Sequence, residues 1–235
     1  MQCYKALQPI SVLSFDLDDT LYDNKPVIAA AEAAMLQSLA QHAPITRGYD
    51  SDFWWQQRRL LAKATPEIRH DLGRWRLLGI EAGLVSLGLS QCEAGEIAEV
   101  AYTAFWQERT NIKIKPEVKA LLTALASRYQ LVAITNGNAC IQKMGLGDLF
   151  EFSLQAGPDG RMKPYADLFL TAANRLQTAP QYILHIGDSH RADVMGALNA
   201  GCQAAWLDHL QQPVAILPHI KLTKLLELEA IIKGL

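Results

Sequence analysis

The sequence lacks the long apolar stretches that mark a membrane protein. No apolar run among its 235 residues approaches the roughly 18 that are needed to cross a bilayer. The N-terminal segment also lacks the pattern of a secretory signal peptide, because Lys5 is followed by Pro9 and then by a short strand-like run. We therefore expect a cytoplasmic protein that has no membrane partner.

The sequence also has few cysteines and no excess of positive charge. The chain has 4 cysteines and no C-x-x-C pair, which indicates neither a zinc site nor a disulfide framework. Reduced thiols are therefore expected. The 22 Lys and Arg residues nearly balance the 24 Asp and Glu residues, and the formal net charge is −2. There is no basic stripe of the kind that nucleic-acid binding needs, so we expect no nucleic-acid partner.

What the chain does contain is an acidic segment directly after a strand-like run. Residues 10–15 are short, apolar and rich in β-branched side chains, which predicts a buried strand. Asp16-Leu17-Asp18-Asp19-Thr20 follows, and positions i and i+2 of an extended chain share a face, so Asp16 and Asp18 point the same way. Two such close carboxylates are costly unless a cation or a shared proton holds them. The alternative for this segment alone is a solvated turn.

Three further polar clusters favour a functional site over that turn. Thr135-Asn136-Gly137 follows the apolar run at 131–134, Lys163-Pro164 precedes a helical pattern, and Gly187-Asp188 follows the run at 182–186, with Asp193 five residues later. In parallel α/β sheets, ligands bind outside the carboxyl ends of the strands. An acid, a hydroxyl, a lysine and a second acid at strand ends therefore predict one site assembled from separated segments. His185, inside its strand, is interpreted as a core histidine.

Helical and strand patterns divide the chain into two parts. Residues 24–112 show helical spacing without a convincing strand, including a capping box at Ser90-x-x-Glu93. After Pro116, strands and helices alternate. We expect strands at 131–135, 152–155, 182–186 and 203–207, and helices at 116–128, 138–145, 165–176, 190–200 and 220–235.

The four clusters, in this order, resemble the motifs of the haloacid dehalogenase-like (HAD) superfamily. The matching residues are Asp16-x-Asp18-x-Thr20, Thr135, Lys163-Pro164, and Gly187-Asp188 with Asp193. The resemblance covers nearly the whole chain. It implies an α/β fold with a doubly wound, parallel, Rossmann-like sheet of strand order 5-4-1-2-3. Residues 1–23 and 113–235 would form this core domain, and residues 24–112 an inserted α-helical bundle that acts as a cap.

The resemblance also implies a role for each core residue. Asp16 would be the nucleophile that forms an aspartyl-phosphate, and Asp18 the general acid and then the base. Mg²⁺ would be held by Asp16, Asp188 and the main-chain carbonyl of Asp18, with Asp193 acting through water or by orienting Asp188. The phosphate would be bound by the remaining motif residues, Thr135, Asn136, Gly137 and Lys163. Asp19 and Thr20 are interpreted as local turn structure.

The cap is where the leaving group would be selected. Arg74 and Arg76 are the cap residues predicted to contact substrate, although each has the alternative of an ordinary surface or packing role. Trp75 is in phase with Leu72 and Ile68, which favours packing.

The segments around the motifs are similar to a bacterial subgroup that dephosphorylates flavin mononucleotide and 5-amino-6-(5-phosphoribitylamino)uracil, a riboflavin precursor. We therefore predict a Mg²⁺-dependent phosphomonoesterase acting on a small-molecule phosphate monoester, as a monomer or homodimer. The alternatives are a sugar-phosphate or nucleotide phosphatase of the same family, a dehalogenase, or a non-catalytic phospho-acceptor or binding protein. A dehalogenase is disfavoured because that branch lacks the second aspartate and the metal.

Overall fold

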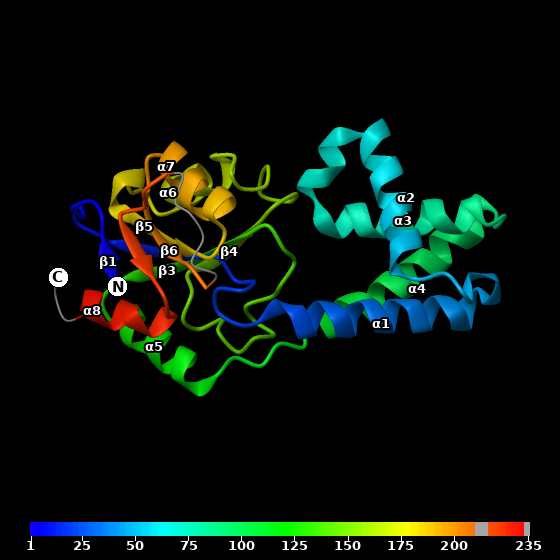
Figure 1. The fold of residues 1–235 in the computed structure, drawn as a ribbon, viewed down its shortest axis with the longest axis horizontal. Helices are drawn as coiled ribbons and strands as arrows, with labels where there is room; N and C mark the ends of the chain where they lie inside the picture. The colour runs from blue at the N-terminus through cyan, green and yellow to red at the C-terminus, as the bar shows by residue number, and fades with distance from the viewer. Residues whose placement is uncertain (210–215, 233–235) are drawn as a thin grey trace. The chain divides into compact units, whose positions relative to one another are not determined.

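The computed structural model describes residues 1–209 and 216–232 and divides the chain into two compact units. The core unit contains Met1–Asp23 and Lys113–Leu235, and the helical unit contains Asn24–Ile112 (Figure 1). The helical unit is therefore an insertion within the core sequence. No helix of the described residues is long and apolar enough to cross a membrane.

The core unit is built on one sheet. The described residues place seven strands in the order β1-β7-β6-β5-β2-β3-β4, and only the β1–β7 pair is antiparallel. The strands are Gln2–Cys3 (β1), Val12–Phe15 (β2), Gln130–Thr135 (β3), Phe152–Gln155 (β4), Ile183–Gly187 (β5), Gln203–Leu207 (β6) and Ile220–Leu222 (β7). The run β6-β5-β2-β3-β4 is the predicted 5-4-1-2-3 order, so the predicted fold class is confirmed.

Helices cover both faces of this sheet, which makes it doubly wound. In Figure 1, α6 and α7 lie on one face, and α5 and α8 on the other. The helical segments are Pro116–Ala126 (α5), Asp167–Arg175 (α6), a π-helical turn at His190–Met195, Gly196–Asn199 (α7) and Glu229–Ile232 (α8), with 3-10 turns at Pro180–Tyr182 and Leu225–Leu228. Every residue of β2 is buried, as expected for a central strand between two helical layers.

The helical unit has its own apolar core. Its helices are Asn24–His42 (α1), Ser51–Ala64 (α2), Leu72–Ser86 (α3) and Gln91–Arg109 (α4), with 3-10 turns at Pro44–Thr46 and Pro66–His70. α1 packs along α4, α4 on α3, and α3 on α2. The capping box at Ser90 and Glu93 is present, as the sequence predicts. Buried side chains such as Met35, Trp54 and Phe105 meet at its centre.

One predicted helix of the core unit was wrong, and another was right only in its later part, where helical turns span Leu225–Leu228 and Glu229–Ile232. Residues 138–140 have no regular structure and residues 141–145 form a turn, in which Gly145 takes a positive φ of 68°. The predicted helix at 220–235 begins instead as strand β7, where Ile220 and Leu222 are buried and Lys221 is half-buried. This alternation is the period of a strand. The last three residues of that prediction lie outside the described residues.

Candidate active site

Asp16 stands at the point where the chain order of the sheet reverses. It follows β2, which pairs with β3 on one side and β5 on the other. The Asp16 N–H donates to the carbonyl of Ile186 at 2.9 Å, which extends the β2–β5 ladder to the carboxyl end of β2. The switch point of a doubly wound sheet is the expected place for a ligand crevice. The side chain of Asp16 is buried, with 10% of its surface exposed.

Lys163 binds two of the predicted acids at once. Its Nζ donates to Asp16 Oδ1 at 2.7 Å, to Asp193 Oδ1 at 2.7 Å, and to the carbonyl oxygen of Ile134 at 2.6 Å. An ammonium has three donors, so all of them are satisfied. Burial alone would lower the pKa of Lys163, but Asp16 and Asp193 raise it above its ordinary value, and the side chain stays charged.

The loop after β3 fixes the main chain of Lys163. The Asn136 Oδ1 accepts from the Lys163 N–H at 2.7 Å, and the Asn136 Nδ2 donates to the Lys163 carbonyl at 2.9 Å. Thr135, buried at the end of β3, accepts from the Gly137 N–H at 2.9 Å through Oγ1. The structure therefore brings Thr135, Asn136, Gly137 and Lys163 together, and gives Asn136 a positioning role that the sequence did not predict. Their contacts with phosphate stay a prediction.

Asp193 is held by a network of buried donors. Its Oδ1 also accepts from His185 Nε2 at 3.1 Å, and its Oδ2 accepts from the Ser189 N–H at 2.9 Å. Burial lowers the pKa of His185, so the ring is neutral and its Nδ1 accepts from the Ser14 hydroxyl at 2.9 Å. The interpretation of His185 as a satisfied core histidine is confirmed, and its partner is a site residue.

The backbone around Asp193 allows its side chain to be buried against the end of β5. It belongs to the π-helical turn His190–Met195, a helix form that is enriched at functional sites. A Cβ atom added to Gly187 would overlap the side-chain Cγ of Asp193, so glycine is required at the end of β5.

Asp188 directly follows β5 and lies across the strand-order reversal from Asp16. Its carboxyl accepts from the Thr20 hydroxyl at 3.3 Å, and its main-chain carbonyl accepts from Trp206 Nε1 at 2.8 Å. Thr20 thus contacts a predicted metal ligand, which its sequence interpretation as a turn residue missed. Burial first, and then the charges of Asp193 and Asp19, raise the pKa of Asp188 to about 6.

The acids fit a divalent cation. Carboxylate oxygens of Asp16, Asp188 and Asp193 lie within 4.8 Å of one another. With Lys163 as their counter-charge, three carboxylates leave a formal surplus of two negative charges (−3 + 1 = −2). Burial raises the pKa of Asp16 well above its usual range in spite of Lys163, whereas Lys163 and His185 overcome the effect of burial and lower the pKa of Asp193. Hard oxygen ligands and surplus negative charge suit Mg²⁺.

Asp18 lies in the turn that follows Asp16. Its Oδ1 accepts a hydrogen bond from the Tyr22 hydroxyl. Asp19, next along the chain, has a positive φ of 55°, a conformation that Asp tolerates better than most residues. This supports its interpretation as local turn structure, while the acid–base role and the metal contact of Asp18 stay predictions.

The predicted cap arginines differ from each other. Arg74 is exposed, and its N–H donates to the Asp71 side chain at 2.9 Å at the start of α3. The Arg76 side chain is 11% exposed, pairs with Glu32 at 3.4 Å, and lies 3.9 Å from the centre of the Phe105 ring. Both belong to the helical unit, whereas the other predicted site residues belong to the core unit. Their contact with substrate stays a prediction.

A family model of haloacid dehalogenase-like hydrolases matches residues 10–201. The chain belongs to this family. The match spans all four motifs, and the predictions of family and of a phosphatase-type hydrolase are confirmed.

Relatives of known function extend this result along the whole chain. The chain is 41% identical to the 5-amino-6-(5-phospho-D-ribitylamino)uracil phosphatase YigB of Escherichia coli, over 99% of the chain and 100% of that protein. It is 28% identical to a phosphoserine phosphatase of Thermus thermophilus, over 87% of the chain and 91% of that protein. Among solved structures, a 2-haloacid dehalogenase from Pseudomonas syringae matches with a TM-score of 0.90 and 33% identity, over 95% and 98% of the two chains.

Proposed function

We propose that this HAD hydrolase is a Mg²⁺-dependent phosphomonoesterase whose substrate is 5-amino-6-(5-phosphoribitylamino)uracil or flavin mononucleotide. The observation that carries the proposal is the cluster of Asp16, Lys163, Asp188 and Asp193, in which Asp188 is half-buried and the other three are buried. The substrate class is supported by the 41% identity to YigB over essentially both full lengths.

Asp16 is the proposed nucleophile. A carboxylate oxygen of Asp16 forms a bond to phosphorus while the bond from phosphorus to the substrate alkoxide breaks. Lys163, 2.7 Å from Asp16 Oδ1, offsets the repulsion between the carboxylate and the phosphoryl oxygens. The ladder bond from the Asp16 N–H to β5 and the buried lysine together fix the attacking group in place.

Asp18 is the proposed acid and base. It gives a proton to the leaving alkoxide, and then takes one from the water that attacks the phosphorus of the aspartyl-phosphate. Inorganic phosphate leaves, and Asp16 is restored. The Tyr22 hydroxyl, which donates to Asp18 Oδ1, orients that carboxyl through both steps.

Mg²⁺ would be held by the carboxylates of Asp16 and Asp188 and the main-chain carbonyl of Asp18. When bound, it supplies positive charge for the phosphoryl oxygens. Asp193 has both oxygens engaged by Lys163, His185 and the Ser189 N–H, so we assign it to positioning Lys163.

The 33% identity to a 2-haloacid dehalogenase makes dehalogenation the second candidate. A halide leaves without needing a proton, so such a reaction has no use for Asp18 as an acid. A metal cluster completed by Asp188 is likewise matched to a phosphoryl group rather than to a carbon centre.

One set of assays distinguishes the two candidate functions. We expect para-nitrophenyl phosphate to be hydrolysed with Mg²⁺, activity to be lost with EDTA and regained with Mg²⁺, and no halide to be released from 2-chloropropionate. A panel of phosphorylated metabolites ranked by kcat/KM then tests the substrate. Phosphatase activity in metal-free protein, or halide release without phosphatase activity, would contradict the proposal.

A further inference from the structure

His185 is a buried side chain beside the site, and the proposed chemistry gives it no role. It lies in β5 with 0% of its surface exposed, and it pairs across the sheet with Ser14 of β2. The Phe169 ring lies edge-on to the imidazole, with the ring centres 4.9 Å apart. An apolar side chain would fill this space without the cost of burying polar atoms. The hydrogen bonds of the imidazole are therefore what distinguishes it from an apolar residue at this position.

These hydrogen bonds belong to a chain of buried side chains that starts and ends beside the proposed nucleophile. The Ser14 hydroxyl lies 2.9 Å from His185 Nδ1, and His185 Nε2 lies 3.1 Å from Asp193 Oδ1. The Lys163 Nζ donates to Asp193 Oδ1 at 2.7 Å and to Asp16 Oδ1 at 2.7 Å. Ser14 and Asp16 are two positions apart on extended chain and share a face of the sheet. The contacts therefore link the side chain of Ser14 to that of Asp16 through three intervening residues.

The charges fix the direction of each hydrogen bond in this chain. Lys163 keeps Asp193 ionised, and an ionised carboxylate only accepts. His185 Nε2 therefore carries the ring proton, and Nδ1 accepts from the Ser14 hydroxyl, which holds the imidazole in this tautomer. A neutral donor can hold Asp193 in place without neutralising the charge that Asp193 presents to Lys163. A lysine or arginine at this position would compete with Lys163 for the same carboxylate.

Lys163 depends on Asp193 because the proposed reaction consumes its other charged partner. In the aspartyl-phosphate, Asp16 no longer has the carboxylate charge that attracts Lys163. Asp193 is then the only carboxylate paired with the ammonium in the part of the chain that the structure describes. The Asp193 carboxylate itself accepts from the N–H of Ser189, which caps the π-helical turn, and from His185. Because His185 belongs to β5, it ties this carboxylate to the rigid sheet.

We propose that His185 is a positioning residue of the phosphoryl-transfer site. Through Asp193, it holds the Lys163 ammonium against Asp16, and Ser14 supports it by fixing the tautomer. The inference rests on the proposed function, because it assigns His185 to the nucleophile of that reaction. It extends the site into the interior of the sheet, where the sequence indicates only a core histidine.

The test compares two amide side chains that differ in reach. His185→Gln places an amide nitrogen as many bonds from the main chain as the imidazole Nε2, so this variant can still donate to Asp193. In His185→Asn the amide nitrogen is a bond closer to the main chain, at the position of Nδ1, and the donor to Asp193 is lost. The kcat and KM of both variants are measured with para-nitrophenyl phosphate at saturating Mg²⁺.

We expect His185→Asn to lower kcat by about tenfold to a hundredfold, the scale on which a misplaced group of an active site reduces the rate. The values of kcat and kcat/KM should fall equally, because the ammonium acts on charge that develops in the transition state. His185→Gln should stay within about threefold of the wild type, because it retains the hydrogen bond to Asp193.

A double-mutant cycle tests whether His185 acts through Asp193. Asp193→Ala removes the acceptor, so adding His185→Asn to that variant should lower kcat by less than about twofold more. Phe169→Leu is the control for packing around the imidazole. It should lower the melting temperature, because a fully buried ring is replaced by a smaller side chain, and keep kcat within about twofold of the wild type.

Equal kcat values for His185→Gln and His185→Asn would overturn the inference and leave the phosphatase function in place. The full loss of His185→Asn on top of Asp193→Ala, or an equal loss in Phe169→Leu, would overturn it as well. If His185→Asn does not fold, as judged by circular dichroism, His185→Leu takes its place in each comparison, because it fills the space without a donor. Absence of Mg²⁺-dependent hydrolysis by the wild-type protein would instead reject the proposed function, and the inference with it.

Discussion

Replacing Lys163 with methionine is the sharpest test of the core site. The change removes the ammonium that donates to Asp16, Asp193 and the Ile134 carbonyl at 2.6–2.7 Å, but keeps much of the buried aliphatic volume. The formal surplus of negative charge in the cluster then rises from two to three. Removing one partner of a buried ion pair costs about 3–5 kcal/mol, a large part of a typical total stability of roughly 5–15 kcal/mol.

The same change should affect stability and catalysis differently with and without metal. In EDTA, we expect the free energy of unfolding of Lys163→Met to fall by about 3 kcal/mol or more, measured by urea denaturation. Saturating Mg²⁺ should recover part of this loss, because the cation binds the excess negative charge of the folded state. The kcat should fall by about 10²–10³ even with Mg²⁺, the scale of one lost electrostatic contact in a closed site.

Lys119→Met, at an exposed position of α5, is the control and should change neither quantity. Near-normal kcat and an unfolding free energy equal to that of the control would refute this reasoning. Lys163 would then be dispensable, and the buried contacts would not describe the working enzyme.

Changes at other residues of the core site and changes of pH have expected outcomes as well. Asp16→Asn should abolish turnover without loss of fold, and Asp18→Asn should accumulate phosphate on Asp16, which mass spectrometry of the intact protein would detect; phosphate on another residue would contradict these roles. Gly187→Ala should lower the free energy of unfolding by about 1–3 kcal/mol and displace Asp193, since the new methyl group overlaps that side chain. An unchanged melting curve would contradict this and show that the π-helical turn can shift to make room for the methyl group. Because the pKa of Asp188 is raised to about 6, the affinity for Mg²⁺ should weaken as the pH falls through this value, which Mg²⁺ titrations would measure. The metal-free protein should lose stability as the pH rises from 3.8 to about 6, because the folded state binds an extra proton in this range. Denaturation curves at several pH values measure this second effect.

The central sheet and the core site could be predicted from the sequence because each signal was local and chemically distinctive. Apolar runs ending in Asp16, Thr135 and Asp188 mark both a strand and the end of that strand where a ligand binds. The family resemblance added the strand order, which no single segment encodes. Thr20 and His185 were placed correctly along the chain, but their contacts with Asp188 and Asp193 depend on tertiary structure.

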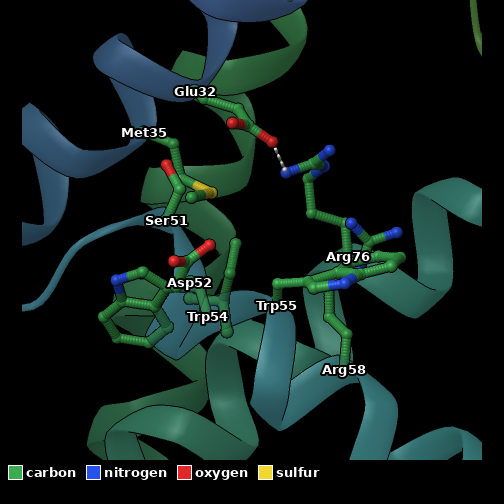
Figure 2. Close-up of a pocket in the computed structure, with 9 residues that line it drawn as sticks. Glu32, Met35, Ser51, Asp52, Trp54, Trp55, Arg58 and Arg76 are labelled. Atoms are coloured by element: carbon green, nitrogen blue, oxygen red, sulfur yellow. Dashed lines mark hydrogen bonds and ion pairs between the residues drawn. The ribbon is translucent and has the colours of Figure 1, made fainter.

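The failures have physical causes. The segment at 138–145 has helical spacing, but Gly145 at its end takes a positive φ and the chain turns instead. At the C-terminal tail, Ile220 and Leu222 form too short an alternation to be distinguished from a helix, and pairing with β6 decides in favour of a strand. The helical unit has a pocket, lined by residues such as Glu32 of α1, Arg58 of α2 and Arg76 of α3 (Figure 2), that the sequence does not indicate, because it forms only when these helices pack together.

The insertion of the helical unit has a consequence for the order in which the protein is made. Asp16 leaves the ribosome 147 positions before its partner Lys163, and Ser14 leaves it 171 positions before its partner His185. The helical unit is complete at Ile112, before β3 has been synthesised, and its packing lies within residues 24–112, so we expect it to fold first on the nascent chain. Strand β2, which precedes the proposed nucleophile Asp16, is made before the strands that pair with it, and the core site can be completed only after Asp193 has been synthesised.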